Sequence, residues 1–336
     1  MVARSLAGTA AKANIPCPFR RRRFKTPEEM TRTVLSTDDA DECAQPTAFG
    51  SRLPSELYYA FYREAYPDLD GLSDAILADH YERHGRREGR VASPYALRAN
   101  FLKLPVTDAR ILEIGPGHKP AFRGPNVRYF DVEDAAGLRA RAERFNEKNS
   151  QDTPDIHYVS ATGDLSVVTE RFDIVYSSHA IEHQPDLVRH LQQVHALLDE
   201  SGVFMAIVPD RRFCFDQSIP GTTIGEVLEA NLHRRRRHRI ADLIDTYALH
   251  THSDPPRHWR GDSPPVSPTA ARVRMALDVL NGASGAYYDV HAWRFSSEEM
   301  REVVQLLKEL ELSPFSDARV FSTPYGAGEF CMILAR

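Results

Sequence analysis

The chain has 336 residues, of which 42% are hydrophobic and 26% charged, and its formal net charge at pH 7 is −5. These values are typical of a globular protein that buries a core, and the length allows one large domain or a domain with a small module. The charge excludes a chain-wide basic signature of nucleic-acid binding, and the longest apolar runs are too short to cross a bilayer.

Residues 1–50 form the first distinct segment. They lack hydrophobic periodicity and carry no acidic residue before Glu28, so we expect a disordered tail. A transit peptide starts with a similar Ala-, Arg- and Ser-rich composition, but the acidic stretch at residues 38–42 interrupts that pattern. No secretory apolar segment is present, and the four cysteines form no CxxC pair, so we expect a cytoplasmic location and no disulfide scaffold.

Residues 51–95 are predicted to form a small helical module. Aromatic residues recur at helical spacing, Pro67 and Gly71 interrupt them, and a second helical pattern ends near Gly85. The segment contains the motifs Tyr58-Tyr59, Tyr66-Pro67-Asp68, His80-Tyr81, His84-Gly85 and Glu88-Gly89-Arg90. This pattern resembles a module that recurs in bacterial glycosyltransferases and other surface-polysaccharide proteins. The resemblance implies an association with glycosyltransferases.

From residue 109 onward the chain alternates β-rich runs with helical patterns. The β-rich runs lie at residues 109–115, 126–132, 156–160, 171–178 and 202–209. The clearest helical pattern covers residues 185–201, where apolar residues line one face. Strands that alternate with helices predict an α/β fold with a mostly parallel, doubly wound sheet.

The C-terminal part has a different pattern. Residues 296–312 predict a helix with a serine cap and acidic residues in its first turn. Two β-rich runs follow, at residues 318–323 and 329–336, and the Pro- and Gly-containing residues between them predict an antiparallel hairpin.

A long insertion, at about residues 211–290, separates the fifth β-rich run from this C-terminal part. It contains two predicted helices, at about 223–249 and 268–281, and a basic run at residues 233–239. Because the insertion follows a strand of a parallel sheet, we expect it to cap the substrate over the carboxyl ends of the strands. The basic run either contacts phosphate or forms the solvated face of a helix.

Glu113, Gly115, Pro116 and Gly117 end the first β-rich run and are the first candidates for binding a cofactor. Glycines let the backbone turn sharply and approach a ligand, and the helix after such a turn points its N–H groups at that ligand. A pyrophosphate-binding GxGxxG motif needs a third glycine, which is missing from GPGHKPA. The acid at Glu113 instead suits a ligand with a positive amino or sulfonium group.

The remaining cofactor candidates follow the next β-rich runs in order. They are Asp131 and Val132 after the second run, Asp164 and Leu165 after the third, and Ser178 at the end of the fourth. A carboxylate at the end of the second strand can accept hydrogen bonds from both ribose hydroxyls of a nucleoside. We therefore expect Asp131 to bind a ribose, with Glu133 as the alternative.

These ordered motifs resemble those of class I S-adenosylmethionine-dependent methyltransferases of the type 11-like group. The most specific part is FDIVYSSHAIEHQPD, residues 172–186. The resemblance implies S-adenosylmethionine as cofactor and a Rossmann-like α/β domain at residues 96–336, with a mostly parallel seven-stranded sheet and a C-terminal antiparallel hairpin. It also implies that Asp164 contacts the adenine amino group, that Leu165 packs on the adenine ring, and that Ser178 faces the methionine part or the substrate.

Three further segments resemble methyltransferases associated with bacterial glycan genes. They are VPDRRFCFD at residues 208–216, HWRGD at 258–262 and DVHAWRFS at 289–296. The resemblance implies a sugar hydroxyl of a surface polysaccharide, or of its precursor, as methyl acceptor. Trp259 and Trp293 either form an aromatic platform for a sugar or anchor the insertion to the core.

Four side chains are candidates for the general base that methylation of a poor hydroxyl nucleophile requires: His179, His183, Asp210 and His291. A histidine has the most suitable ordinary pKa, but the sequence alone does not rank the four.

The H-x-x-E-H spacing from His179 to His183 also raises the question of a metal. A family of small-RNA methyltransferases carries an E-x-x-E-H site for Mg²⁺, but here His179 replaces the first acid, and imidazole favours softer metals. A structural role for Glu182 and His183 is an equal alternative, and we assign no metal ligand from the sequence.

Two other functions stay open at this point. The H-x-x-E-H spacing and the basic run at residues 233–239 would fit a methyltransferase for RNA or a small molecule, with or without a metal. A binding module that keeps the fold but lacks turnover is the third hypothesis. Among partners, we expect a glycan or small-molecule acceptor rather than a nucleic acid.

Overall fold

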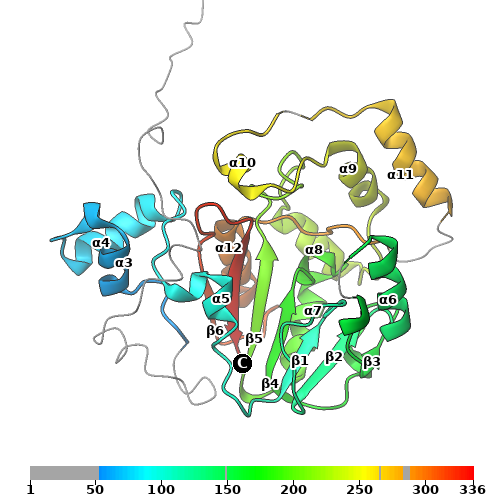
Figure 1. Ribbon diagram of the computed structural model, residues 1–336, viewed down its shortest axis with the longest axis horizontal. Helices are drawn as coiled ribbons and strands as arrows, with labels where there is room; N and C mark the ends of the chain where they lie inside the picture. The colour runs from blue at the N-terminus through cyan, green and yellow to red at the C-terminus, as the bar shows by residue number, and fades with distance from the viewer. Residues whose placement is uncertain (1–52, 148–149, 265, 283–287) are drawn as a thin grey trace, which may run out of the picture.

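A seven-stranded mixed sheet forms the centre of the computed structural model, which describes residues 53–147, 150–264, 266–282 and 288–336. The strands lie in the order β3-β2-β1-β4-β5-β7-β6 (Figure 1). Their bounds are β1 (Ile111–Ile114), β2 (Val127–Asp131), β3 (Tyr158–Val159), β4 (Phe172–Ser178), β5 (Leu198–Pro209), β6 (Asp317–Val320) and β7 (Glu329–Ala335). The tail expected at residues 1–50 lies outside the described residues.

The direction of the strands matches the topology that the sequence predicts. Strands β1 to β5 pair in parallel, whereas β7 is antiparallel to both β5 and β6. The expected Rossmann-like sheet with a C-terminal antiparallel hairpin is therefore confirmed. The strand order reverses between β1 and β4, and in sheets of this kind ligands bind beyond the carboxyl ends of the strands at that point.

Strand β5 shows why the sheet is covered on both faces. Its residues from Val203 to Val208 are all buried, as expected of a central strand between two layers. Val203, Met205 and Ile207 pack into one hydrophobic cluster, and the alternating Phe204, Ala206 and Val208 pack into the other. The period of two in a β-strand thus divides one apolar run between two cores.

Helices of the C-terminal half cover one face of the sheet. They are α7 (Leu187–Ala196), α8 (Ile224–Leu232) and α12 (Ser297–Glu309), and all three contribute side chains to the cluster that contains Phe204. Helix α6 (Ala135–Arg144) follows β2. None of the helices in the described part of the chain is long and apolar enough to cross a membrane.

The N-terminal segment covers the other face. It contains α3 (Tyr59–Ala65), η3 (Pro67–Leu69), α4 (Asp74–His80), the π-helical turn η4 (Tyr81–Gly85), η5 (Pro94–Ala96) and α5 (Arg98–Phe101). Its aromatic residues Phe61, Tyr62 and Tyr81 share one core with β4 and β5. The aromatic repeat in the sequence therefore marks a buried surface, which joins the segment to the sheet.

The insertion lies beyond the carboxyl ends of the strands. In Figure 1 the arrowhead of β5 points toward helices α9 (Ile240–Leu249), α10 (Pro255–Trp259) and α11 (Ala270–Gly282). The single helix expected at residues 223–249 is wrong, because the chain forms α8 and α9 with the basic run between them. Arg234 adopts a positive φ of 48° there, and Arg235 Nε donates to the carbonyl of Pro185 (2.6 Å), which fixes the break.

Short turns complete the chain. Residues Ser150–Asp152 (η6), Leu165–Val167 (η7) and Ile181–His183 (η8) each form one turn of 3-10 helix. Turn η8 follows β4 at the point where the strand order reverses, so its side chains lie beside the expected ligand crevice.

Candidate active site

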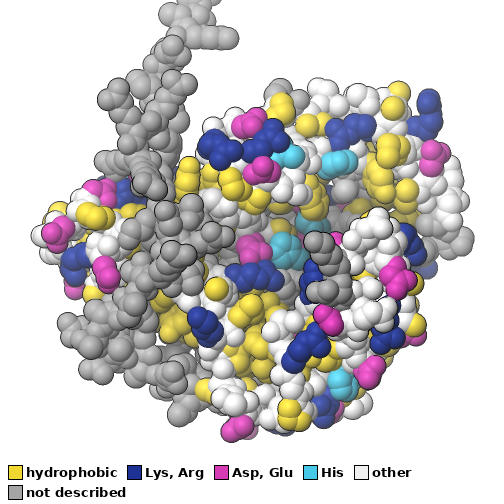
Figure 2. All heavy atoms as spheres, in the orientation of Figure 1, with side chains coloured by type: hydrophobic (Ala, Val, Ile, Leu, Met, Phe, Trp, Pro, Cys, Tyr) yellow, Lys and Arg dark blue, Asp and Glu magenta, His cyan; other side chains and the backbone are white. Residues whose placement is uncertain are grey.

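A cavity of about 330 Å³ lies at the carboxyl ends of β1, β2 and β4. Its lining includes six residues that the sequence singles out: Gly115, Gly117, Asp131, Val132, His179 and His183. These residues come from the ends of three neighbouring strands, so the fold brings together positions that are far apart in the sequence. In Figure 2, histidine and charged side chains gather between the insertion and the body of the domain.

The turn after β1 requires its two glycines. Gly115 and Gly117 have φ values of 70° and 55°, in the left-handed region that side chains with a Cβ disfavour. The Gly115 N–H donates to the carbonyl of Phe130 (2.9 Å), which ties the turn to β2. Pro116 is buried between the two glycines. Its side chain does not line the cavity, so a direct contact with a cofactor stays a prediction.

Asp131 ends β2 at the cavity wall, where the sequence predicts a ribose ligand. Its carboxylate accepts hydrogen bonds from the backbone N–H of Val132 (2.7 Å) and Glu133 (3.4 Å). Burial raises the pKa of Asp131, and these N–H groups act in the opposite direction. The side chain is therefore held in one orientation by its own loop.

Glu113 lies on β1 beneath the glycine turn and is not among the residues that line the cavity. Its carboxylate accepts hydrogen bonds from the backbone N–H of Ala121 (2.7 Å) and Phe122 (3.1 Å). Burial raises the pKa of Glu113 to about 7. The structure thus gives this acid a role in holding the loop after the turn, and a direct contact with a cofactor stays a prediction.

Asp164 and Leu165 also lie outside the cavity lining. The Asp164 carboxylate accepts hydrogen bonds from Arg189 (2.7 Å), Gln193 (2.6 Å) and Arg236 (3.2 Å). Although burial acts to raise it, the pKa of Asp164 is lowered well below its usual value by the hydrogen bonds it accepts. Leu165 is buried in the hydrophobic cluster under α7. Their contacts with adenine remain expectations.

Ser178 ends β4 and His179 follows it, beside an ion-pair network that the sequence does not indicate. Arg98 donates to Ser178 Oγ (2.8 Å) and pairs with Glu329 (2.9 Å), and His179 Nε2 lies 2.7 Å from the Glu329 carboxylate. Although burial favours the neutral imidazole, the hydrogen bond to Glu329 raises the pKa of His179 above its usual value. His179 lines the cavity, whereas Ser178 lies behind it.

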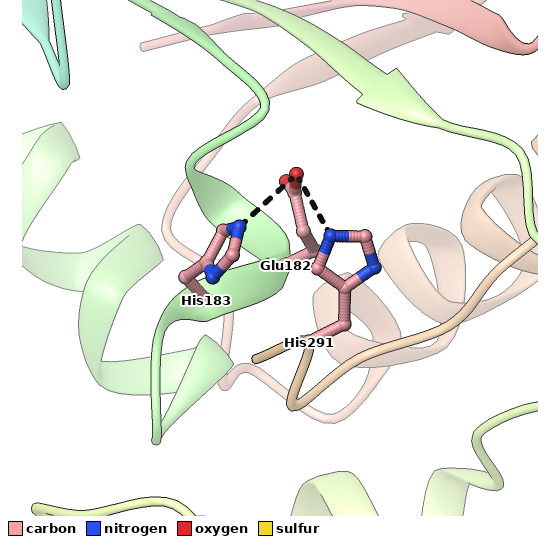
Figure 3. A group of neighbouring side chains, drawn as sticks. All are labelled: Glu182, His183 and His291. Carbon is pink, nitrogen blue, oxygen red and sulfur yellow. Dashed lines mark ion pairs between the residues drawn. The ribbon is translucent and has the colours of Figure 1, made fainter. Parts of the chain in front are cut away.

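Glu182, His183 and His291 form a compact group beside the cavity (Figure 3). The Glu182 carboxylate lies 3.7 Å from His183 Nε2 and 3.8 Å from His291 Nε2. The two imidazole rings meet edge to face, with their centroids 4.8 Å apart. Burial lowers the pKa of His183 to about 3, so its ring is neutral near pH 7.

Backbone hydrogen bonds bring His291 to this group. The N–H groups of Ala292 (2.8 Å) and Trp293 (3.1 Å) both donate to the carbonyl of Glu182. The Trp293 indole donates to the carbonyl of Gln184 (2.5 Å). The segment after α11 is therefore tied to turn η8, which sequence separation alone does not reveal.

Asp216 supports His291 from the insertion. Its carboxylate lies 2.5 Å from His291 Nδ1, and Arg294 Nε lies 3.6 Å from its other oxygen. Asp216 ends the segment at residues 208–216, which resembles glycan-associated methyltransferases, but no motif in the sequence assigns it a role. The resemblance could have marked this residue as functional, whereas Arg98 and Glu329 carry no comparable signal.

The fourth base candidate, Asp210, is separated from the other three. It is 0% exposed, and its carboxylate is bound by Arg212 (2.6 Å) and Thr323 (2.6 Å). It does not line the cavity. The structure therefore brings His183 and His291 together, places His179 at the same cavity, and leaves Asp210 in a buried ion pair.

Both tryptophans anchor the polypeptide around the site. Trp293 is buried, and Trp259 stacks on Phe213 with ring centroids 3.7 Å apart. The Trp259 indole also donates to the carbonyl of Ala327 (2.7 Å). These contacts favour the anchoring role over a sugar platform.

A family model described as a methyltransferase domain matches residues 82–263 of the chain. Among solved structures, the chain is similar to an S-adenosylmethionine-dependent methyltransferase from Thermotoga maritima, a candidate histamine N-methyltransferase. The identity is 16% and the TM-score 0.34, over 77% of this chain and 95% of that chain. No curated protein matches the chain.

Two further solved structures are similar. A candidate O-methyltransferase from Nostoc punctiforme has 15% identity and a TM-score of 0.35, over 75% of this chain and 60% of that chain. The trans-methyltransferase CalH, in complex with S-adenosylhomocysteine, has 16% identity and a TM-score of 0.34, over 79% of this chain and 60% of that chain. The chain thus spans less than two thirds of the length of these two proteins.

Proposed function

This chain belongs to the family of methyltransferase domains that use S-adenosylmethionine as methyl donor, and we propose that it methylates a sugar hydroxyl of a surface polysaccharide or of its precursor. Two resemblances support this acceptor. The segment at residues 51–95 resembles a module of glycan-processing proteins, and the segments at residues 208–216 and 289–296 resemble glycan-associated methyltransferases. The first resemblance also supports an association with glycosyltransferases.

The cavity residues fit S-adenosylmethionine. The volume of about 330 Å³ lies within the range of about 300–1,000 Å³ typical of small-molecule sites. A Cβ on Gly117 would meet no protein atom within 4 Å, so the glycine leaves room in the cavity. We propose that Asp131 accepts the ribose hydroxyls and that Val132 packs on the adenosine. When bound, the cofactor supplies a methyl group on a positively charged sulfur.

His179 is the base that the geometry supports best. It lines the cavity, and its Nε2 is held by Glu329, so Nδ1 can take the proton of an acceptor hydroxyl. Glu329 then stabilises the imidazolium that forms. The acceptor oxygen displaces the sulfur in line, and the bonding electrons of the broken S–C bond stay on sulfur. The single observation that carries this assignment is the 2.7 Å contact between His179 and Glu329 at the cavity wall.

The basic run at residues 233–239 supports an RNA acceptor less well. Arg235 donates to a backbone carbonyl, Arg236 pairs with Asp164, and Arg239 pairs with Glu226 (2.7 Å). Arg235 and Arg236 therefore hold the insertion to the domain, and Arg239 pairs within the insertion.

Transfer of labelled methyl from S-adenosylmethionine to a panel of lipid-linked and free bacterial glycans tests the proposal. Wild type should label at least one glycan, and His179→Asn should lose about 10²–10⁴-fold of kcat while still binding the cofactor. Asparagine tolerates the positive φ of this position, so the variant should fold. Labelling of RNA but of no glycan would contradict the proposed acceptor, and full activity of His179→Asn would contradict the proposed base.

A further inference from the structure

The Glu182 carboxylate is buried without hydrogen bonds. The residue is 1% exposed, and neither carboxylate oxygen has a hydrogen-bond partner among the residues that the structure describes. A buried carboxylate of this kind is normally hydrogen-bonded, paired or bound to a metal. The Nε2 atoms of His183 and His291 lie 3.7 and 3.8 Å from this carboxylate, which is too far for hydrogen bonds.

We propose that Glu182, His183 and His291 bind one divalent transition-metal ion of the zinc type. One ligand atom from each residue lies within 4.8 Å of the other two, and in Figure 3 both imidazole rings point a nitrogen toward the Glu182 carboxylate. Two imidazoles and one carboxylate form a ligand set that suits Zn²⁺ and similar ions, whereas Mg²⁺ prefers oxygen ligands. Three protein ligands leave at least one coordination position open.

A neighbouring carboxylate orients His291 in the way that histidine ligands of metal ions are commonly oriented. Asp216 accepts from His291 Nδ1 at 2.5 Å, which directs Nε2 toward Glu182. Such a carboxylate behind a histidine fixes the tautomer and makes the ring a better ligand. His183 Nδ1 lies 3.3 Å from the Asp289 carboxylate but makes no hydrogen bond with any of the described residues. Ligands bonded to zinc at about 2.0–2.1 Å lie roughly 3.3 Å apart, so the side chains need only small rotations to close on the ion.

The position of the group suggests what the ion does. His183 belongs to both the group and the cavity wall, so an open coordination position would face the methyl donor site. If the proposed function is right, the ion binds the acceptor hydroxyl and lowers its pKa, and the proton leaves to His179. Metal binding itself does not depend on that function and can be measured without cofactor or acceptor.

Titration of the chelator-treated full chain with Zn²⁺ and Co²⁺ tests the site. Calorimetry should show one tight Zn²⁺ site per chain, and Co²⁺ should produce visible absorption bands of a low-symmetry site. Glu182→Gln and His291→Gln should lose both signals. His250→Gln, at an exposed histidine of the insertion, should keep them and thus exclude binding to surface histidines.

A second variant protects the test against a folding defect. Asp216→Asn keeps the size of the side chain but alters the support of His291, so it should weaken Zn²⁺ binding about 10–100-fold. Circular dichroism checks that each variant is folded. Absence of Zn²⁺ and Co²⁺ binding to wild type, or equal binding to folded Glu182→Gln, would overturn the proposed site. Asp131→Ala should lose the cofactor but keep the metal, so failure of either proposal can be told apart.

Discussion

At the scale of single residues, His179 combines an uncommon backbone with a charged partner. Its φ of 52° lies in the left-handed region, where residues other than glycine are uncommon. The conformation is held by a hydrogen bond from its N–H to the carbonyl of Ile207 (2.9 Å) and by the ring contact with Glu329. Backbone conformations of this kind cluster at active sites, which agrees with the role proposed for His179.

Glu329→Gln should shift the pH profile of methyl transfer. Glu329 raises the pKa of His179, and the base must be neutral, so activity rises as the pH passes upward through that pKa. Removing the carboxylate lowers the pKa, so the acidic limb of kcat/KM should move to lower pH while the plateau rate falls. The measurement is kcat/KM between pH 5 and 9, with Glu302→Gln on the exposed face of α12 as control. An unmoved limb would mean that another group titrates.

Other residues show what sequence could not predict at this scale. Motif spacing places Glu113 near the end of β1, and Asp164 lies in the turn after β3, where it caps η7. Their side chains, however, are engaged by backbone N–H groups and by Arg189, respectively. A motif specifies a position along the chain, whereas the partner of a carboxylate depends on loops that pack from elsewhere.

At the scale of elements, the strands and helix α11 of the insertion were predictable, but the break between α8 and α9 was not. The apolar runs at residues 171–178 and 202–209 become β4 and β5 because their alternating residues fill two cores. The helix expected at residues 223–249 breaks where Arg235 and Arg239 make tertiary contacts. Helical periodicity in the sequence contains no information about such contacts. Local patterns therefore predict the elements of the core better than those of the insertion.

Helix α7 gives a prediction for stability. His190 is 3% exposed, its ring packs edge-on against Phe204, and neither ring nitrogen has a hydrogen-bond partner among the described residues. Burial lowers its pKa from 6.5 to about 3. The unfolded chain therefore binds a proton on His190 below about pH 6.5, whereas the folded chain does not until about pH 3. The free energy of unfolding therefore decreases progressively as the pH falls from about 6.5 to about 3, because protonation of His190 favours the unfolded chain.

His190→Leu should remove this part of the pH dependence. The quantity to compare is the free energy of unfolding of the variant minus that of wild type. This difference should be about 2 kcal/mol more favourable to the variant at pH 5 than at pH 7. Urea unfolding of both proteins at the two pH values measures this, and acidic groups elsewhere cancel in the comparison. Equal differences at pH 5 and pH 7 would contradict the account of a neutral buried imidazole.

At the scale of the whole molecule, the site depends on parts that meet only in the fold. The cavity of the candidate site is made by strand ends that sequence motifs mark in order. The group of Glu182 with His183 and His291 needs the segment after α11 to return to turn η8. The H-x-x-E-H spacing groups Glu182 with His179 and His183, whereas the structure groups it with His183 and His291. The sequence predicts the cavity because the residues of the cavity follow strands that end at one edge of the sheet. It does not predict the group of Glu182, His183 and His291, because His291 comes from a segment that follows no strand of this sheet edge.

The central claim is that this cavity binds S-adenosylmethionine through Asp131. Calorimetric titration of wild type, Asp131→Ala and the control Asp155→Ala, at an exposed acid outside the cavity lining, tests it most directly. We predict micromolar binding of S-adenosylmethionine and S-adenosylhomocysteine to wild type and to the control, loss of binding in Asp131→Ala, and no binding of NAD⁺. No binding of either adenosyl ligand to wild type, or unchanged binding to Asp131→Ala, would contradict the account.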